Sequence, residues 1–320
     1  MANAATQLPI AISAGDPAGI GPEIALRAAT AYGRDCLLVG DKHGLINTAR
    51  QLGLPLATTI SIIDIGASTG RSTLTNHSIV PGEPSALSGE LAFQAVCRAA
   101  ETVQIGQACA LVTAPISKAA LHLAGHRYPG HTELLAELAG NVPVRMMLAN
   151  PELRVILVTV HQPLRQALDE LSREKILTTL QIAHQSLQNF GIKAPRLAVA
   201  GVNPHAGENG LFGDDESTVV APAIATAIQQ GIDATGPYPP DTIFMRARGL
   251  TEFDAVIAMY HDQGLIPVKY LGVEQGVNVT LGLPFVRTSP DHGTAFDIAG
   301  SAKADPASMS AALNMAAQLS

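Results

Sequence analysis

The first half of the chain alternates between short apolar runs and segments in which apolar residues recur at helical spacing. Each apolar run has the length of a strand and ends at a glycine or a proline. We expect strands at residues 9–15, 36–40, 60–66 and 109–115. The segments between these runs predict helices at residues 22–31, 42–52 and 89–106.

The second half continues this pattern. Two apolar runs, 144–149 and 154–160, lie close together and predict an antiparallel pair. A long helix is expected over 164–190, because its apolar positions follow a period close to 3.6 and Gly191 stands where a helix would end. Further strands are expected at 196–202 and 254–260, and further helices at 218–231 and 306–319. Strands that alternate with helices favour an α/β class with a largely parallel sheet.

The composition is that of a globular chain and excludes several kinds of partner. Of the 320 residues, 47% are apolar and 15% are charged, which excludes intrinsic disorder and suits about two domains. The formal charge is −7 and Trp is absent, so we expect no nucleic-acid partner. No apolar run is long enough for a membrane span, and the N-terminal residues lack a secretory pattern. With only three widely spaced cysteines, these features predict a cytoplasmic protein without membrane contact.

Three of the ten histidines lie at or just beyond the carboxyl ends of predicted strands. They are His161, His205 and His261. Ligands bind at this edge of open α/β sheets, and three converging imidazoles suit a divalent metal with an open coordination position. The alternative is that each histidine closes a strand and hydrogen-bonds a loop. Asp262 could be the acceptor that a metal-bound histidine needs, or the N-cap of a helix.

Residues 129–132, PGHT, place His131 and Thr132 at the start of a helical segment, ELLAEL. A helix N-terminus binds anions through its free N–H groups and its dipole. A plain N-cap at Thr132, with Glu133 in the first turn, explains the same residues equally well.

A glycine-rich turn and three cations add candidates for ligand binding. Residues 15–23, GDPAGIGPE, have GxxxGxG spacing, which is not the dinucleotide-binding fingerprint, and we interpret them as a tight turn that a ligand can approach. Lys118, Lys269 and Arg287 each follow an apolar segment, the last two in expected loops. Together these cations could hold a phosphate or a carboxylate, although each one alone suits a solvated surface position.

From about residue 9 to the C-terminus, long motifs occur in an order that resembles one enzyme family. They resemble the 4-hydroxythreonine-4-phosphate dehydrogenases of vitamin B6 biosynthesis, the PdxA family. The motifs are GDPAGIGPE, TAPISK, YPGHTELLAE, NPHAGENGLFGDDE, PPDTIF, AMYHDQGLIPVKYLG and GVNVTLGLPFVRTSPDHGTAFDIAG. The two ends, GDPAGIGPE and HGTAFDIAGSAKADP, are also similar to segments of the isocitrate and isopropylmalate dehydrogenases.

The resemblance implies a two-lobed isocitrate/isopropylmalate dehydrogenase-like fold. Such a fold is a three-layer α/β/α sandwich, with the active site in the cleft between the lobes and at the interface of a homodimer. The cofactor-binding lobe would be discontinuous, formed by residues 1–125 plus 266–320. Residues 126–265 would form the lobe for metal, substrate and dimerisation.

The resemblance also implies roles for single residues. His161, His205 and His261 match the ligands of one divalent metal, which could be Zn, Co, Mn or Mg. The positions that match substrate contacts are His131, Thr132, Lys269, Asn278 and Arg287. His292, Gly293 and Thr294 match a loop that holds NAD or NADP. The candidates for the general base are Asp241, Asp262 and Lys118.

The implied reaction acts on a small phosphorylated hydroxy acid. It is the NAD(P)- and metal-dependent oxidation of 4-phosphooxy-L-threonine to 2-amino-3-oxo-4-phosphooxybutanoate, which loses CO₂ to give 3-amino-2-oxopropyl phosphate. A sister group with the same core motifs resembles dehydrogenases of 4-phospho-D-erythronate or threonate in sugar-acid catabolism. Two other classes stay open: a metal-dependent hydrolase, since three histidines can also activate water, and a non-catalytic protein that binds a phosphorylated ligand.

Overall fold

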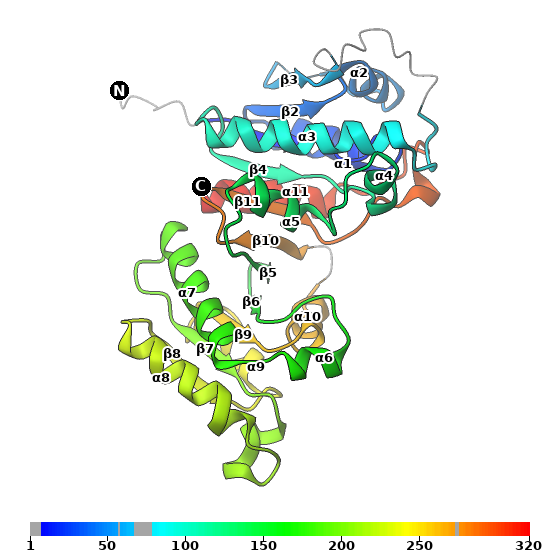
Figure 1. Cartoon of the computed structure of the whole chain (residues 1–320). Coiled ribbons are helices and arrows are strands. Elements are labelled where there is room, and N and C mark those ends of the chain that lie inside the picture. Colours follow the sequence, from blue (N-terminus) through cyan, green and yellow to red (C-terminus); the bar gives the residue numbers. More distant parts are fainter. Residues whose placement is uncertain (1–7, 57, 67–78, 273–274) are drawn as a thin grey trace, which may run out of the picture. The chain divides into compact units, whose positions relative to one another are not determined.

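The computed structural model describes residues 8–56, 58–66, 79–272 and 275–320 (Figure 1). Its contacts divide the chain into two compact units. Unit 1 consists of Met1–Val142 and Leu283–Ser320, and unit 2 consists of Pro143–Gly282. The chain therefore starts in unit 1, forms unit 2 and returns. These boundaries differ from those expected from the sequence, which were 125 and 266.

The described residues of unit 1 form five parallel strands in the order β3-β2-β1-β4-β11. They are β1 (Ile10–Ser13), β2 (Cys36–Gly40), β3 (Ile60–Asp64), β4 (Ala110–Thr113) and β11 (Val286–Pro290). β1 and β4 are buried at every position, because helices cover both faces of the sheet. α11 (Ala307–Leu319) contacts β1, β4 and β11, and α1 (Gly21–Tyr32) packs against α11. α3 (Ala86–Gln104) contacts β1, β2 and β4. The remaining helices are α2 (Lys42–Gln51), α4 (Lys118–Leu123), α5 (His131–Leu138) and the 3₁₀ turn η6 (Phe296–Ile298).

In unit 2, the residues that the structure describes form six strands in the order β10-β5-β6-β9-β7-β8. They are β5 (Arg145–Ala149), β6 (Arg154–Leu157), β7 (Leu197–Ala200), β8 (Ala234–Tyr238), β9 (Ala255–Ala258) and β10 (Val277–Leu281). β5 is antiparallel to both β6 and β10, and the other pairs are parallel. Helices α7 (Arg173–Asn189) and α8 (Ala221–Gln229) pack on strands β5, β6, β8 and β10, while α9 (Ile243–Ala247) and α10 (His261–Tyr270) contact β5, β6, β7 and β9. The remaining elements are α6 (Leu164–Asp169), η3 (Pro204–Gly210) and η4 (Glu216–Val220).

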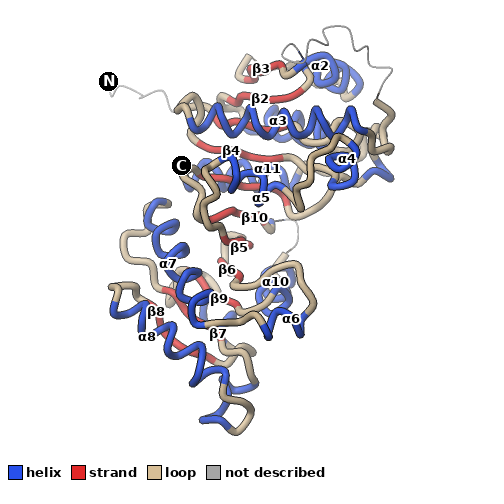
Figure 2. The backbone as a smooth tube through the Cα atoms, viewed as in Figure 1, coloured by secondary structure: helices blue, strands red, loops and turns tan. Residues whose placement is uncertain are grey.

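The expected α/β class, with helices on both sides of mainly parallel strands, is confirmed within each unit (Figure 2). The predicted antiparallel pair is β5 with β6. β8, β10 and β11 were not predicted, because none of them forms a continuous apolar run: β8 reads ATGPY, β10 reads VNVTL and β11 reads VRTSP.

Two expectations about secondary structure are wrong. The single helix expected over 164–190 is two helices, α6 and α7. They separate where the Ser172 hydroxyl accepts a hydrogen bond from the Lys175 N–H at 3.2 Å and caps α7. The apolar period continues across this break and so concealed it. Lys269 and Arg287, expected in loops, lie instead in α10 and β11.

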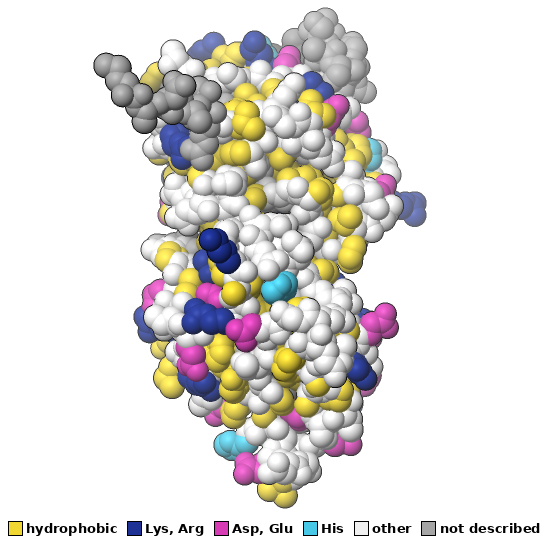
Figure 3. All heavy atoms as spheres, turned by 90° about the vertical axis from the view of Figure 1, so that its left-hand side faces the viewer, with side chains coloured by type: hydrophobic (Ala, Val, Ile, Leu, Met, Phe, Trp, Pro, Cys, Tyr) yellow, Lys and Arg dark blue, Asp and Glu magenta, His cyan; other side chains and the backbone are white. Residues whose placement is uncertain are grey.

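One face of the molecule is mixed in charge. On the face drawn in Figure 3, basic and acidic side chains are interspersed, and the formal charge of the chain is −7. Within the residues that the structure describes, no helix has both the length and the apolar character that a membrane span needs.

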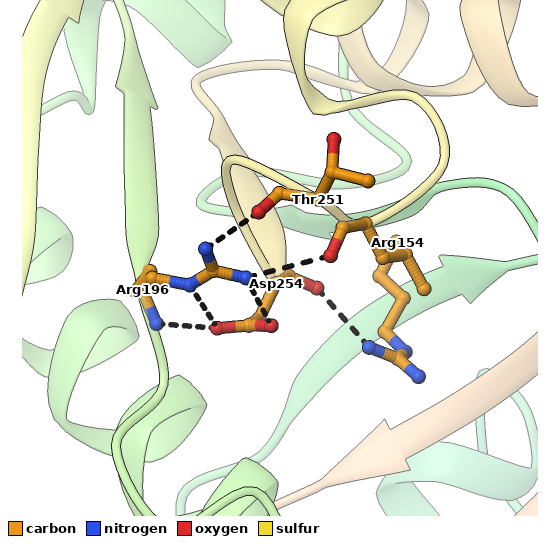
Figure 4. A network of polar contacts seen from close by, with 5 residues as sticks. Arg154, Arg196, Thr251 and Asp254 are labelled. Carbon is orange, nitrogen blue, oxygen red and sulfur yellow. Dashed lines mark hydrogen bonds and ion pairs between the residues drawn. The ribbon is translucent and has the colours of Figure 1, made fainter.

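An ion-pair network joins the amino ends of β6, β9 and β7 (Figure 4). The Asp254 carboxylate accepts hydrogen bonds from Nε, Nη2 and the backbone N–H of Arg196, at 3.0, 3.1 and 2.8 Å. Arg196 also donates to the Thr251 carbonyl oxygen at 2.6 Å. Burial acts to raise the pKa of Asp254, but these bonds and the charges of Arg196 and Arg154 outweigh it and hold that pKa below its usual value.

We expect Asp254→Asn to lower the free energy of unfolding by about 1–3 kcal/mol near pH 7, because it removes a charged hydrogen-bond acceptor. Since the folded-state pKa of Asp254 is depressed, its contribution to stability is present above the unfolded pKa of about 3.9 and is lost as the pH falls further. Urea unfolding of the wild type and of Asp254→Asn, at pH 7 and at pH 3, measures this contribution. The difference between their free energies of unfolding should be smaller at pH 3 than at pH 7. Glu101→Gln, at a surface ion pair with Arg98, is the matched control and should change stability by about 0.5 kcal/mol or less.

Candidate functional site

The three histidines singled out in the sequence follow three adjacent strands of unit 2. β6, β9 and β7 are neighbours and run parallel, so their carboxyl ends lie at one edge of the sheet. His161 lies just past β6, His205 just past β7, and His261 is the first residue of α10 after β9. The three histidines therefore lie at one edge of the sheet, which is where the sequence pattern predicts a ligand site.

Buried hydrogen bonds tie these strand ends together. The Thr159 hydroxyl donates to the Met259 carbonyl oxygen at 2.8 Å, which joins the ends of β6 and β9. The Gln263 side chain accepts from the Met259 N–H and donates to the Gly201 carbonyl oxygen, both at 2.7 Å, which joins the ends of β9 and β7. Because residue 264 is a glycine, α10 can pack close to β6: a Cβ at Gly264 would lie 2.6 Å from Cδ2 of Leu157.

A cavity of about 420 Å³ opens at this edge. Its lining includes His161, Tyr260, His261 and Asp262. The ring centroids of His161 and His261 are 5.6 Å apart. Nδ1 of His261 lies 2.7 Å from Oδ1 of Asp262, and an Nδ1–H that donates to this carboxylate leaves Nε2 as the basic nitrogen. Asp262 thus acts as the acceptor that orients His261, while Tyr260 is the N-cap of α10.

His205 lies on the next strand end in an exposed loop, where its ring is 6.0 Å from that of Phe212. Within residues 8–56, 58–66, 79–272 and 275–320, no three His, Cys, Asp or Glu side chains are grouped closely enough to hold a metal ion. The chemistry of the donor set nevertheless fits a divalent metal. Two imidazoles line one open cavity, one is oriented by a carboxylate, and a third imidazole follows the adjacent strand.

Three further candidates of unit 2 lie on different elements. Lys269 is in the last turn of α10, and Asn278 is on β10 with its Oδ1 buried and without a hydrogen-bond partner in the described structure. Asp241 is exposed just before α9, and it is not among the residues that line the cavity. Of the two carboxylates considered as a general base, the structure places only Asp262 at the cavity.

In unit 1 a buried cation lies beside the start of α5. Arg287, on β11, is 2% exposed, and its Nη2 donates to the Thr113 hydroxyl of β4 at 2.6 Å. Burial lowers the pKa of Arg287 to about 10, so the guanidinium keeps its charge at neutral pH. His131 is the first residue of α5, and burial together with the charge of Arg287 lowers its pKa well below the usual range. At neutral pH Arg287 therefore supplies the charge, while His131 is a neutral hydrogen-bonding group.

Two buried polar atoms, one on α5 and one on β1, have no hydrogen-bond partner in the part of the chain that the structure describes. They are Nε2 of His131 and Oγ of Ser13, whose Cα pairs with that of Thr113 between β1 and β4. Buried polar groups are almost always hydrogen-bonded, so such atoms around a buried charge suit an anionic ligand. Thr132 follows in the first turn of α5, where N–H groups are unpaired. Lys118 is exposed at the start of α4.

The glycine-rich turn of unit 1 packs against its own chain. A Cβ at Gly15 would lie 2.3 Å from the Pro115 carbonyl oxygen, and one at Gly19 would lie 2.8 Å from that of Thr294. The Ile20 N–H also donates to the Thr294 oxygen at 3.0 Å. At these positions the glycines permit close approach of backbone. Gly15 also lines a cavity of about 260 Å³, so approach of a ligand to this turn stays a prediction. The turn thus supports the segment of His292, Gly293 and Thr294.

We expect Gly19→Ala to displace the Thr294 segment, because the new methyl group would overlap backbone. The overlap should lower the free energy of unfolding by about 1–3 kcal/mol. If this segment holds a dinucleotide, NADH affinity should also fall, which fluorescence titration of NADH measures. Metal affinity is the internal control, since the histidines belong to unit 2. Unchanged NADH affinity in a variant of lowered stability would show that the segment does not hold the cofactor.

Thr113, Thr159 and Gln263 were not predicted from the sequence. None of them belongs to a spacing pattern, because their partners lie far along the chain. The one available signal was a polar residue at or next to the end of a predicted strand, which Thr113 and Thr159 share with the histidines.

Comparisons with known proteins find relatives of one family over nearly the whole chain. The family model described as "Pyridoxal phosphate biosynthetic protein PdxA" matches residues 33–316. A 4-hydroxythreonine-4-phosphate dehydrogenase of Beijerinckia indica is 47% identical over 97% of this chain and 95% of its own. A D-threonate 4-phosphate dehydrogenase of Pectobacterium atrosepticum is 44% identical over 97% and 98%. The crystal structure of 4-hydroxythreonine-4-phosphate dehydrogenase from Klebsiella pneumoniae superimposes with a TM-score of 0.90 at 43% identity, covering 98% of this chain and 99% of that one.

Proposed function

The chain belongs to the PdxA family of pyridoxal phosphate biosynthetic proteins, and from this premise we propose that it is a 4-hydroxythreonine-4-phosphate dehydrogenase. The reaction is oxidation of the C3 hydroxyl of 4-phosphooxy-L-threonine, with hydride passing to NAD⁺ or NADP⁺ and a proton released. The product, 2-amino-3-oxo-4-phosphooxybutanoate, is a β-keto acid that loses CO₂ to give 3-amino-2-oxopropyl phosphate. The observation that carries the proposal is the high identity to dehydrogenases of this name over nearly the full length.

Two groups of residues would serve this reaction. In unit 2, His161, His205 and His261 would hold one divalent metal, Zn, Co, Mn or Mg, and Asp262 orients His261. In the bound state the metal supplies Lewis acidity at the reacting hydroxyl and the dinucleotide accepts the hydride. A general base must take the hydroxyl proton. Asp262 borders the cavity, and Asp241 and Lys118 are the other candidates.

We propose that residues of unit 1 bind the phosphate or carboxylate group of the substrate. The Arg287 guanidinium can donate a pair of parallel hydrogen bonds to phosphate or carboxylate, and neutral His131 can donate or accept one. Thr132, Lys269 and Asn278 are the further substrate contacts that we propose. The unpartnered Oδ1 of Asn278 is an acceptor that suits the substrate amino group. We assign cofactor binding to unit 1 through His292, Gly293 and Thr294.

Oxidation of D-threonate 4-phosphate is the second candidate function, because relatives of that name are 44–45% identical over almost the whole chain. The 4-phospho-D-erythronate alternative belongs to the same class. In both, a hydroxyl stands where 4-phosphooxy-L-threonine has its amino group. Steady-state rates of NADH or NADPH formation at 340 nm, with each 4-phospho acid in turn, test the choice. We expect kcat/KM to be highest for 4-phosphooxy-L-threonine, and a higher value for threonate 4-phosphate would reverse the assignment.

We also propose that the protein is a homodimer, as the family resemblance implies, and that it is cytoplasmic, as its few and widely spaced cysteines favour. If two chains complete the site, a mixed dimer of two differently inactivated chains should recover part of the activity. Sedimentation of a fully active monomer would refute this proposal.

A further inference from the structure

The loop that carries His205 has an unusual backbone. Residues 205–209 all have left-handed φ angles, of 51, 52, 79, 44 and 55°. Only Gly207 among them is a glycine, and side chains with a Cβ avoid this region because the Cβ approaches the following carbonyl oxygen. Such a run persists only where surrounding groups hold it. His205 therefore lies in a loop whose conformation depends on contacts with residues outside the left-handed run.

The Glu216 carboxylate lies at the base of this loop and is only 5% exposed. Its Oε1 accepts hydrogen bonds from the backbone N–H groups of Val202 and Asn203, both at 2.7 Å. Its Oε2 accepts one from Nδ2 of Asn203 at 3.1 Å. A carboxylate is buried at tolerable cost only if its oxygens are hydrogen-bonded, and here every donor belongs to the segment that leads into the left-handed run.

The backbone of the loop also closes directly against this carboxylate. A Cβ at Gly207 would lie 2.7 Å from Oε2 of Glu216, and a Cβ at Gly201 would lie 3.0 Å from Oε1. The loop thus contacts Glu216 both before the left-handed run and inside it. Glu216 itself begins η4, a π-helical turn that continues into α8, so its position is set by regular structure.

We propose that Glu216 is the positioning residue of the metal centre. Its carboxylate holds the loop after β7 in the conformation that presents His205 as the third ligand, next to His161 and His261 on the adjacent strand ends. Glu216 does not touch the metal and acts through His205. This inference rests on the proposed function, which requires the metal.

Co²⁺ binding to the metal-free protein tests the proposal without turnover. Affinity is measured by competition with a chromophoric chelator, and the d–d absorption of Co²⁺ reports its ligand geometry. Glu216→Gln should weaken Co²⁺ binding by about ten- to a hundredfold and alter the absorption band. Gly207→Ala, which pushes a methyl group against Oε2, should act in the same direction. Asp215→Asn is the matched control. Asp215 accepts from the same Asn203 Nδ2, at 2.8 Å, without being bonded to either backbone amide, so binding should change by less than about threefold.

A double-mutant cycle separates positioning from general stability. If Glu216 acts through His205, then Glu216→Gln should have no further effect on Co²⁺ affinity in a His205→Ala background. Equal effects in both backgrounds, or wild-type affinity of Glu216→Gln, would overturn the proposal. If the wild-type protein itself fails to bind Co²⁺, the proposed metal dependence fails, and this inference fails with it.

Discussion

Replacing His261 by alanine is expected to remove the bound metal and to lower turnover by about a thousandfold or more. The ring of His261 shares a cavity with His161, and Asp262 contacts its Nδ1, so its loss removes a nitrogen that a carboxylate orients. A catalytic metal contributes several kcal/mol of charge stabilisation, and each 1.4 kcal/mol is about a factor of ten in rate. Elemental analysis after dialysis and steady-state assays with the 4-phospho acid measure both effects.

Two further variants serve as comparisons for His261→Ala. Asp262→Asn removes the carboxylate that orients His261 but keeps the imidazole, so metal affinity should fall only about ten- to a hundredfold. His43→Ala changes an exposed histidine of α2 and should leave metal content and rate unaltered. Stoichiometric metal in a protein that lacks His161, His205 and His261 together would contradict the assignment.

The second large effect is expected at the buried cation of unit 1. Arg287→Lys keeps the charge but loses the planar fork and the bond to Thr113, and a lysine cannot reproduce two parallel hydrogen bonds to an anion. Loss of a charge-assisted hydrogen bond costs about 1.5–3 kcal/mol, so apparent substrate affinity should fall roughly ten- to a hundredfold. The turnover number should also decrease, because binding of a remote phosphate helps to position the reacting carbon.

The phosphorylated substrate and its dephosphorylated analogue, assayed side by side, identify the group that Arg287 holds. If Arg287→Lys still discriminates between the two as strongly as the wild type, the phosphate must be bound elsewhere, at Lys118, His131 or Thr132. Thr113→Val tests the same site without a change at Arg287 and should show a smaller loss in the same direction. Arg98→Lys, at an exposed ion pair, is the control for lysine substitution and should behave as the wild type.

The strands were largely predictable because burial on both faces leaves continuous apolar runs in the sequence. The ends of β6, β7 and β9 were visible for the same reason, and the histidines that follow them could be recognised as a set. Their adjacency required the strand order β6-β9-β7, which follows from pairing between residues far apart in the chain. No spacing pattern encodes that order.

The parts that escaped prediction depend on contacts of high sequence separation. The bond from Arg287 to Thr113 joins residues 174 positions apart, and the bond from Gln263 to Gly201 joins residues 62 apart. Gly19 illustrates a different limit. The sequence alone does not show whether a glycine makes room for a ligand or for a neighbouring backbone segment. At Gly19 the structure shows that the neighbour is the backbone of Thr294.

This chain is expected to transfer hydride from C3 of a 4-phospho hydroxy acid to a nicotinamide cofactor. The most direct test uses 4-phosphooxy-L-threonine with deuterium at C3, together with NAD⁺ or NADP⁺ and the metal-loaded protein. Mass spectrometry of the cofactor should show one deuterium in each reduced nicotinamide, formed in equal amount to the oxidised product. Release of inorganic phosphate with the deuterium retained in the acid, and no reduced cofactor, would contradict the claim and favour a metal-dependent hydrolase.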